Sequence, residues 1–76
     1  MRINVDVISW FTRFTGGKSR LELDLPPGTN AGAAVLVTGI PEDEIGFITV
    51  NGQKAEKEQL LAEGDSLKVY PLIIGG

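Results

Sequence analysis

The sequence contains neither cysteine nor histidine. Without cysteine, the chain has no disulfide framework and no thiolate nucleophile. Without histidine, it lacks the commonest general base, the commonest metal ligand and every Ser-His or Cys-His pair. We therefore expect a protein that is not an enzyme by itself and that binds no metal or cofactor of its own.

The chain also has few residues and little charge. Seventy-six residues form one domain, and a domain of this size buries only about 60% of its unfolded surface, so a deep substrate cleft is not expected. The net charge is −3 and the seven basic residues are scattered, which argues against a nucleic-acid partner. The uncharged stretch over residues 25–41 is too short, and holds too many glycines and prolines, to span a bilayer. The first ten residues lack the apolar core of a signal peptide, so we expect a cytoplasmic protein without a membrane partner.

Apolar and polar residues alternate over residues 3–7 and again over residues 21–25. This pattern predicts two strands, each with one face in water. Gly-Gly-Lys at residues 16–18 supplies turn chemistry, so the two strands are expected to form a hairpin. Phe11 and Phe14 lie three residues apart in the connection, where one helical turn would point both rings at the core.

Pro-Pro-Gly at residues 26–28 ends the second strand. Thr29 or Asn30 then caps a predicted helix that runs to about Thr38, and Gly39 stops it. One face of this helix is expected to be buried, and its residues are Ala31, Ala34, Val35 and Thr38.

The second half of the chain predicts shorter elements. Residues 47–50 read as a strand, and Asn-Gly at residues 51–52 is the strongest two-residue hairpin signal in the chain. Residues 58–61 are expected to form one helical turn. A turn at Gly64 precedes a final strand that Pro71 ends.

The order strand, strand, helix, strand, short strand, strand predicts an α+β roll of the ubiquitin-like, β-grasp type. In this roll a mixed sheet of four to five strands packs on one helix, and the other face of the sheet stays open. Residues 1–71 would form the domain, and residues 72–76 would protrude as a flexible C-terminal tail.

The chain resembles the sulfur-carrier family in four features that occur in order. They are the predicted β-grasp order, a Val-Asn-Gly hairpin at residues 50–52, a Glu-Gly-Asp turn at residues 63–65 and a final Gly75-Gly76 after a strand and a proline. That family includes the small subunit of molybdopterin synthase and the thiamine sulfur carrier. The long first connection, ISWFTRFTGGKS, resembles the molybdopterin subunits more than the thiamine carriers.

The resemblance implies a reaction at the carboxylate of Gly76. An adenylating enzyme of the ubiquitin-activating type would use ATP to join this carboxylate to AMP. A persulfide-bearing donor protein would then replace AMP by sulfur. The resulting thiocarboxylate would donate its sulfur to a cofactor precursor held by a partner, either the large subunit of a synthase or a thiazole synthase. Gly75 and Gly76 suit this reaction because residues without Cβ atoms can thread a narrow channel.

Three apolar residues of the predicted tail are expected to be buried in the partner: Leu72, Ile73 and Ile74. The alternative is that they are ordinary strand residues that pack back on the domain.

Phe47, Lys68 and Tyr70 are expected on the open face of the sheet, near the base of the tail. There they would contact the activating enzyme, or they would simply cover the sheet. Trp10 is expected to serve local packing, and the acidic run at residues 42–44 is expected to be a solvated loop.

Two other functions remain open on the sequence. The activated Gly76 could be joined to a lysine amine, which would make the chain a ubiquitin-like protein modifier. Alternatively, the chain could be a plain β-grasp interaction module whose tail is inert.

Overall fold

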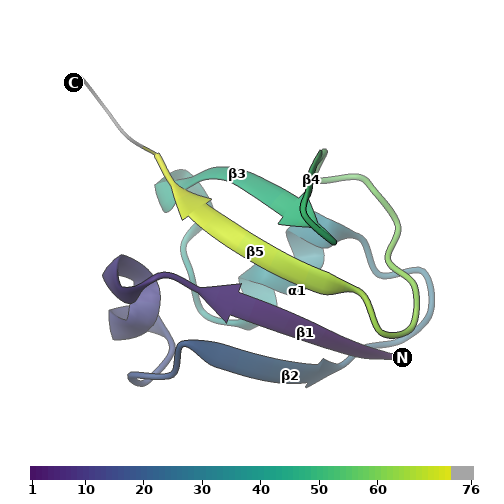
Figure 1. The fold of residues 1–76 in the computed structure, drawn as a ribbon, viewed down its shortest axis with the longest axis horizontal. Helices are drawn as coiled ribbons and strands as arrows, with labels where there is room; N and C mark the ends of the chain where they lie inside the picture. Colours follow the sequence, from purple (N-terminus) through teal and green to yellow (C-terminus); the bar gives the residue numbers. More distant parts are fainter. Residues whose placement is uncertain (73–76) are drawn as a thin grey trace.

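The computed structural model of the protein describes residues 1–72, and Figure 1 shows how their elements are arranged. The elements in chain order are β1 (Arg2–Val7), the 3₁₀ helix η1 (Ser9–Phe14), β2 (Arg20–Asp24), α1 (Ala31–Val37), the 3₁₀ helix η2 (Glu42–Glu44), β3 (Ile45–Val50), β4 (Gln53–Ala55) and β5 (Ser66–Pro71). The strands form one sheet in the order β2-β1-β5-β3-β4. The pair β1–β5 is parallel, and the other three neighbouring pairs are antiparallel.

The last strand of the described residues, β5, therefore lies at the centre of the sheet, between β1 and β3 (Figure 1). Helix α1 lies against one face of the sheet, and no helix of the described residues covers the other face. This arrangement confirms the predicted α+β roll of the β-grasp type, with five strands.

The hydrophobic core lies between the sheet and α1. The strands supply it by alternation, so that in β1 the side chains of Ile3, Val5 and Val7 are buried while the residues between them are not. Phe11 in η1 is fully buried and Phe14 packs partly against the same core, as the sequence predicted. The complete set of buried apolar residues is Ile3, Val5, Val7, Phe11, Leu25, Ala31, Ala34, Val35, Ile40, Ile48, Val50, Leu61, Leu67 and Val69.

Helix α1 begins as the sequence predicted. Asn30 is its N-cap, and the side-chain oxygen of Asn30 accepts a hydrogen bond of 2.8 Å from the backbone N–H of Ala33. The predicted buried face is also confirmed, since its four residues are all buried: Ala31, Ala34, Val35 and Thr38.

The predicted helical turn at residues 58–61 is wrong. Glu58 lies in a turn, and Leu60 forms an isolated antiparallel bridge to Asn30. Two backbone carbonyls in and just before this segment bond to the start of α1. The carbonyl of Gln59 accepts from the N–H of Ala31, and the carbonyl of Lys57 accepts from the N–H of Gly32, both at 2.9 Å. These two N–H groups have no partner inside the helix. A Cβ atom at Gly32 would lie 3.0 Å from the Cβ atom of Lys57, so the glycine allows this close approach.

The Asn-Gly hairpin between β3 and β4 forms as predicted. Asn51 and Gly52 both have positive φ angles, 52° and 84°, as a two-residue hairpin turn of this kind requires. The side chain of Asn51 donates to Asp65 at 2.9 Å and accepts from the N–H of Ser66 at 3.0 Å. This hairpin is thereby tied to the turn that leads into β5.

Candidate functional site at the base of the C-terminal segment

Three segments that are distant in the sequence meet at one end of the sheet. Strand β5 ends at Pro71, and β1 runs parallel to it, so η1, which follows β1, lies at this end too (Figure 1). Strand β3 runs antiparallel to β5, so its start and the preceding η2 are brought to the same end, with Ile45 opposite Pro71. The chain leaves the sheet between these segments, and this end is therefore the natural candidate site.

Leu72, the last described residue, is still tied to the domain. Its backbone N–H donates a hydrogen bond of 3.1 Å to the carbonyl of Glu44, while its side chain is 54% exposed. The pairing of β3 with β5 shifts register between Ile45 and Phe47. Gly46, the residue at the shift, lies against the backbone of Pro71 and Leu72, where a Cβ atom would collide with the carbonyl of Pro71. The direction in which the chain leaves β5 is thus fixed by backbone contacts.

The structure brings together the three residues predicted on the open face. The rings of Phe47 and Tyr70 are stacked, with centroids 4.3 Å apart and planes 8° from parallel. The ammonium group of Lys68 lies 5.5 Å from the Tyr70 ring centroid, and that of Lys54 lies 5.8 Å from the Phe47 ring centroid. Phe47 is 41% exposed, so the pair forms an accessible aromatic surface flanked by positive charge.

The open face has a different character on its other half, over β1 and β2. There the charged residues neutralise one another, with Arg20 bound to Asp6 at 3.0 Å and Arg2 bound to Glu22 at 3.4 Å. These exposed pairs add little stability. Among the described residues, Lys54 and Lys68 form no ion pair. The unneutralised basic groups of this face therefore lie in its aromatic half, near the end of β5.

Trp10 does more than the local packing that the sequence predicted. It is 53% exposed, and it lines a shallow depression of about 350 Å³ together with Glu44, Pro71 and Leu72. The Arg13 guanidinium lies over its ring, 4.3 Å from the centroid. Nothing in the local sequence shows this position, because it follows from the parallel pairing of β1 with β5.

Four of the predicted site residues lie outside the described residues. They are Ile73, Ile74, Gly75 and Gly76. Their roles therefore remain predictions, as does the division of the chain into a domain and a protruding tail.

The acidic run at residues 42–44, which was predicted to be a solvated loop, forms the short helix η2, and none of its three residues is buried. Glu42 accepts a hydrogen bond of 2.9 Å from the ammonium group of Lys57. This bond, together with the charge of Glu42, raises the pKa of Lys57 above its ordinary value of 10.5. Both side chains are more than half exposed, so the pair acts mainly as a link between η2 and the turn after β4.

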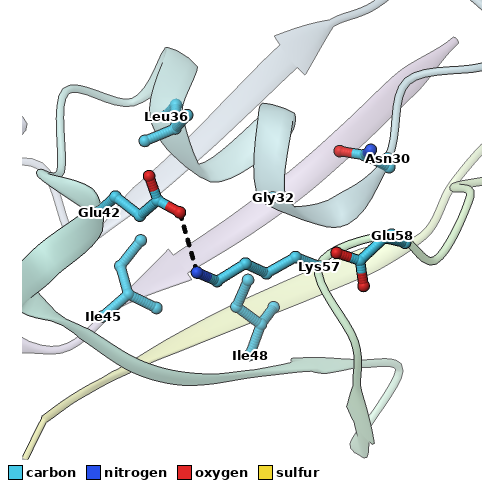
Figure 2. A pocket seen from close by; sticks show the side chains of 8 residues that line it. All are labelled: Asn30, Gly32, Leu36, Glu42, Ile45, Ile48, Lys57 and Glu58. Atoms are coloured by element: carbon cyan, nitrogen blue, oxygen red, sulfur yellow. Dashed lines mark hydrogen bonds and ion pairs between the residues drawn. The ribbon is translucent and has the colours of Figure 1, made fainter.

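The pair lies across a second hollow, of about 180 Å³, between α1 and the sheet (Figure 2). Figure 2 shows its lining residues, which are Asn30, Gly32, Leu36, Glu42, Ile45, Ile48, Lys57 and Glu58. None of the predicted site residues lines this hollow.

Residues 1–72 contain no cluster of three or more His, Cys, Asp or Glu residues that could hold a metal ion. In the same residues, no helix is long and apolar enough to cross a membrane. Among the described residues, the surface next to Leu72 presents exposed apolar and aromatic side chains.

Comparison with solved structures confirms the fold. The putative molybdopterin converting factor subunit 1 from Pyrococcus furiosus aligns with a TM-score of 0.80 at 21% identity, over 96% of this chain and 99% of that one. The small archaeal modifier protein 1 of H. volcanii aligns with a TM-score of 0.77 at 17% identity, over 95% and 98% of the two chains. A chain of the Amycolatopsis orientalis BexX/CysO complex aligns with a TM-score of 0.67 at 19% identity, over 97% and 99%.

A search of the curated proteins finds no match in sequence. The sequence model of one family, described as Mut7-C ubiquitin, matches residues 24–74, which is more than half of the chain. The match includes the aromatic pair and Leu72, and together with the structural neighbours it confirms the resemblance stated from the sequence motifs. The chain therefore belongs to the Mut7-C ubiquitin family and is a ubiquitin-like β-grasp protein.

Proposed function

We propose that the protein is a sulfur carrier whose Gly76 is the carrying residue. The observation that supports this most strongly is the set of backbone contacts at the end of β5. There Gly46 and the carbonyl of Glu44 fix the position of Leu72, the first residue of the segment Leu-Ile-Ile-Gly-Gly. A rigid domain that holds the base of such a segment suits delivery of its end into a partner.

In the proposed reaction the carboxylate of Gly76 attacks the α-phosphate of ATP, and pyrophosphate leaves. The terminal sulfur of a persulfide on a donor protein then attacks the acyl adenylate, and AMP leaves. A thiol cleaves the resulting acyl disulfide, which gives the thiocarboxylate and a new disulfide. The first step belongs to an adenylating enzyme of the ubiquitin-activating type.

The partner that receives the sulfur is proposed to be the large subunit of a molybdopterin synthase. The preference rests on the long first connection, which in the structure holds η1 and places Phe11 in the core. A thiazole synthase of the thiamine pathway is the alternative receiver. All of these partners would be met in the cytoplasm.

A second candidate function is that of a protein modifier, in which a lysine amine attacks the same adenylate-derived acyl group. It is supported by the same exit geometry and by the similarity in fold to the small archaeal modifier protein 1. A plain interaction module with an inert tail is the third candidate.

The test is alkylation read by intact mass. The purified chain is incubated with ATP, an activating enzyme purified from the same cells and a persulfide donor, and iodoacetamide is then added at neutral pH. Because the chain has no cysteine, a fast single adduct requires sulfur that has been added to it. The matched control lacks Gly75 and Gly76.

An adduct on the full chain that is absent from the control supports the carrier. Lysine-linked products without an adduct favour the modifier. If neither product forms with a competent enzyme and donor, and the shortened chain still binds its partners, the interaction module is correct.

A further inference from the structure

Trp10 and Arg13 form a surface that the fold itself does not require. The core position of η1 is filled by Phe11, which is fully buried, whereas Trp10 is 53% exposed. The Arg13 guanidinium lies 4.3 Å from the centroid of the Trp10 ring, and no carboxylate within residues 1–72 forms an ion pair with it. Exposed tryptophan and arginine side chains are the residues most enriched among the energetic anchors of protein interfaces.

This surface is continuous with the base of the C-terminal segment. Trp10 and Leu72 line the same depression, together with Pro71, the last residue of β5, and Glu44. We call these four residues and Arg13 the tail-base patch. It combines three apolar side chains with one positive and one negative side chain, and apolar and aromatic residues and arginine are common in protein interfaces.

The length of chain after Leu72 determines how close a partner must come. Gly76 lies four residues after Leu72, and four extended residues span at most about 14 Å. A protein that holds Gly76 in its active site therefore contacts the surface around Leu72. A standard interface covers about 800 Å² on each partner, so a footprint centred near Leu72 includes the depression that Trp10 lines.

We propose that the tail-base patch is the docking anchor for the enzyme that adenylates Gly76. This inference rests on the proposed function, in which Gly76 is the reacting residue. The enzyme would place an apolar side chain in the depression against Trp10 and Leu72, with a carboxylate facing Arg13. The patch acts beside the aromatic pair Phe47–Tyr70. Of the five patch residues, Glu44, Pro71 and Leu72 lie within residues 24–74, which the family match spans, and Trp10 and Arg13 lie outside them.

The test measures adenylation as ATP–pyrophosphate exchange, with the activating enzyme purified from the same cells and varying concentrations of the chain. Trp10→Ala is expected to raise the KM for the chain by about tenfold or more, as loss of a tryptophan anchor does, with kcat changed less than about twofold. Trp10→Phe, which keeps an aromatic ring under Arg13, is expected to recover part of the loss. The matched control is Leu60→Ala, because Leu60 is 66% exposed and bridges to Asn30 at the start of α1, away from the patch.

A second measurement observes the contact directly. The chain has a single tryptophan, so labelling with 5-fluorotryptophan gives one ¹⁹F resonance, from Trp10. Addition of the unlabelled activating enzyme is expected to shift or broaden this resonance. Far-UV circular dichroism of Trp10→Ala checks that the variant is folded.

The results separate this inference from the proposed function. If the wild-type chain supports exchange but Trp10→Ala has an unchanged KM and the ¹⁹F resonance does not move, the patch is not the anchor and the carrier function stands. If the wild-type chain supports no exchange with an enzyme that is active on another substrate chain, the proposed function fails, and this docking partner fails with it.

Discussion

Gly46 allows the chain to leave the sheet along its observed path because it has no side chain. A Cβ atom at this position would lie 3.0 Å from the Cα atom of Leu72 and would collide with the carbonyl of Pro71. Because both obstacles are backbone atoms, they cannot move aside as a flexible side chain would. The glycine is therefore needed for the register shift that lets β3 pass the end of β5.

We predict that Gly46→Ala lowers the free energy of unfolding by about 1–3 kcal/mol, the usual cost of inserting an extra carbon into a packed site. We also expect the amide proton of Leu72 to exchange faster with solvent, because its hydrogen bond to Glu44 is displaced. Urea unfolding and hydrogen exchange measure the two effects. Gln53→Ala on the exposed edge strand β4 is the control, and equal stability of the two variants would contradict the prediction.

At the scale of single residues, the sequence predicts features that depend on adjacent residues and misses those that depend on distant contacts. The turn at Asn51 and Gly52 was predicted correctly because its backbone angles depend on two adjacent residues. The requirement at Gly46 was not predicted, because it arises from contact with residues that lie about 25 positions further along the chain. Trp10 was interpreted as local packing for the same reason, since its neighbours Pro71 and Leu72 are brought to it only by the fold.

At the scale of elements, α1 is stabilised at its start from two sources. Asn30 caps one N–H group from within the local sequence, and the segment before Leu60 supplies two carbonyls from elsewhere in the chain. The local cap was predicted from the sequence. The two distant carbonyls were not, and they are the reason why residues 58–61 do not form the predicted helical turn.

We predict that Asn30→Ala lowers the free energy of unfolding by about 1 kcal/mol, the typical effect of removing an N-cap side chain. The loss is limited to this amount because the N–H groups of Ala31 and Gly32 keep their own partners. Asn30→Asp retains an oxygen acceptor and is the matched control. Thermal or urea unfolding checks the prediction, which fails if both variants are equally destabilised.

At the scale of the whole molecule, the pair Lys57–Glu42 joins η2 to the segment after β4. The pKa of Lys57 is raised by the hydrogen bond and by the charge of Glu42. The folded state therefore holds this proton more tightly than the unfolded chain does. The contribution to stability is complete below pH 10.5 and is lost as the pH rises through the raised pKa.

We accordingly predict that Glu42→Gln is less stable than the wild-type protein at neutral pH, by a small amount because the pair is exposed. The difference between the two is expected to stay constant up to about pH 10 and then to shrink in more alkaline solution. Urea unfolding of both proteins over this pH range measures it, and all other titrating groups cancel in the comparison. A difference that remains unchanged after Lys57 has lost its proton would contradict the assignment.

The central position of β5 has a consequence for folding during synthesis on the ribosome. Until β5 emerges, the strands already synthesised form two separate hairpins, β1–β2 and β3–β4, that have no strand to join them. Cooperative folding of residues 1–72 thus requires that β5 has been synthesised, and a chain cut short before Ser66 lacks the middle of its sheet. Any chain that has been synthesised as far as Gly76 therefore already contains the strand that joins the two hairpins. The order of synthesis in this way couples completion of the sheet to the presence of Gly75 and Gly76.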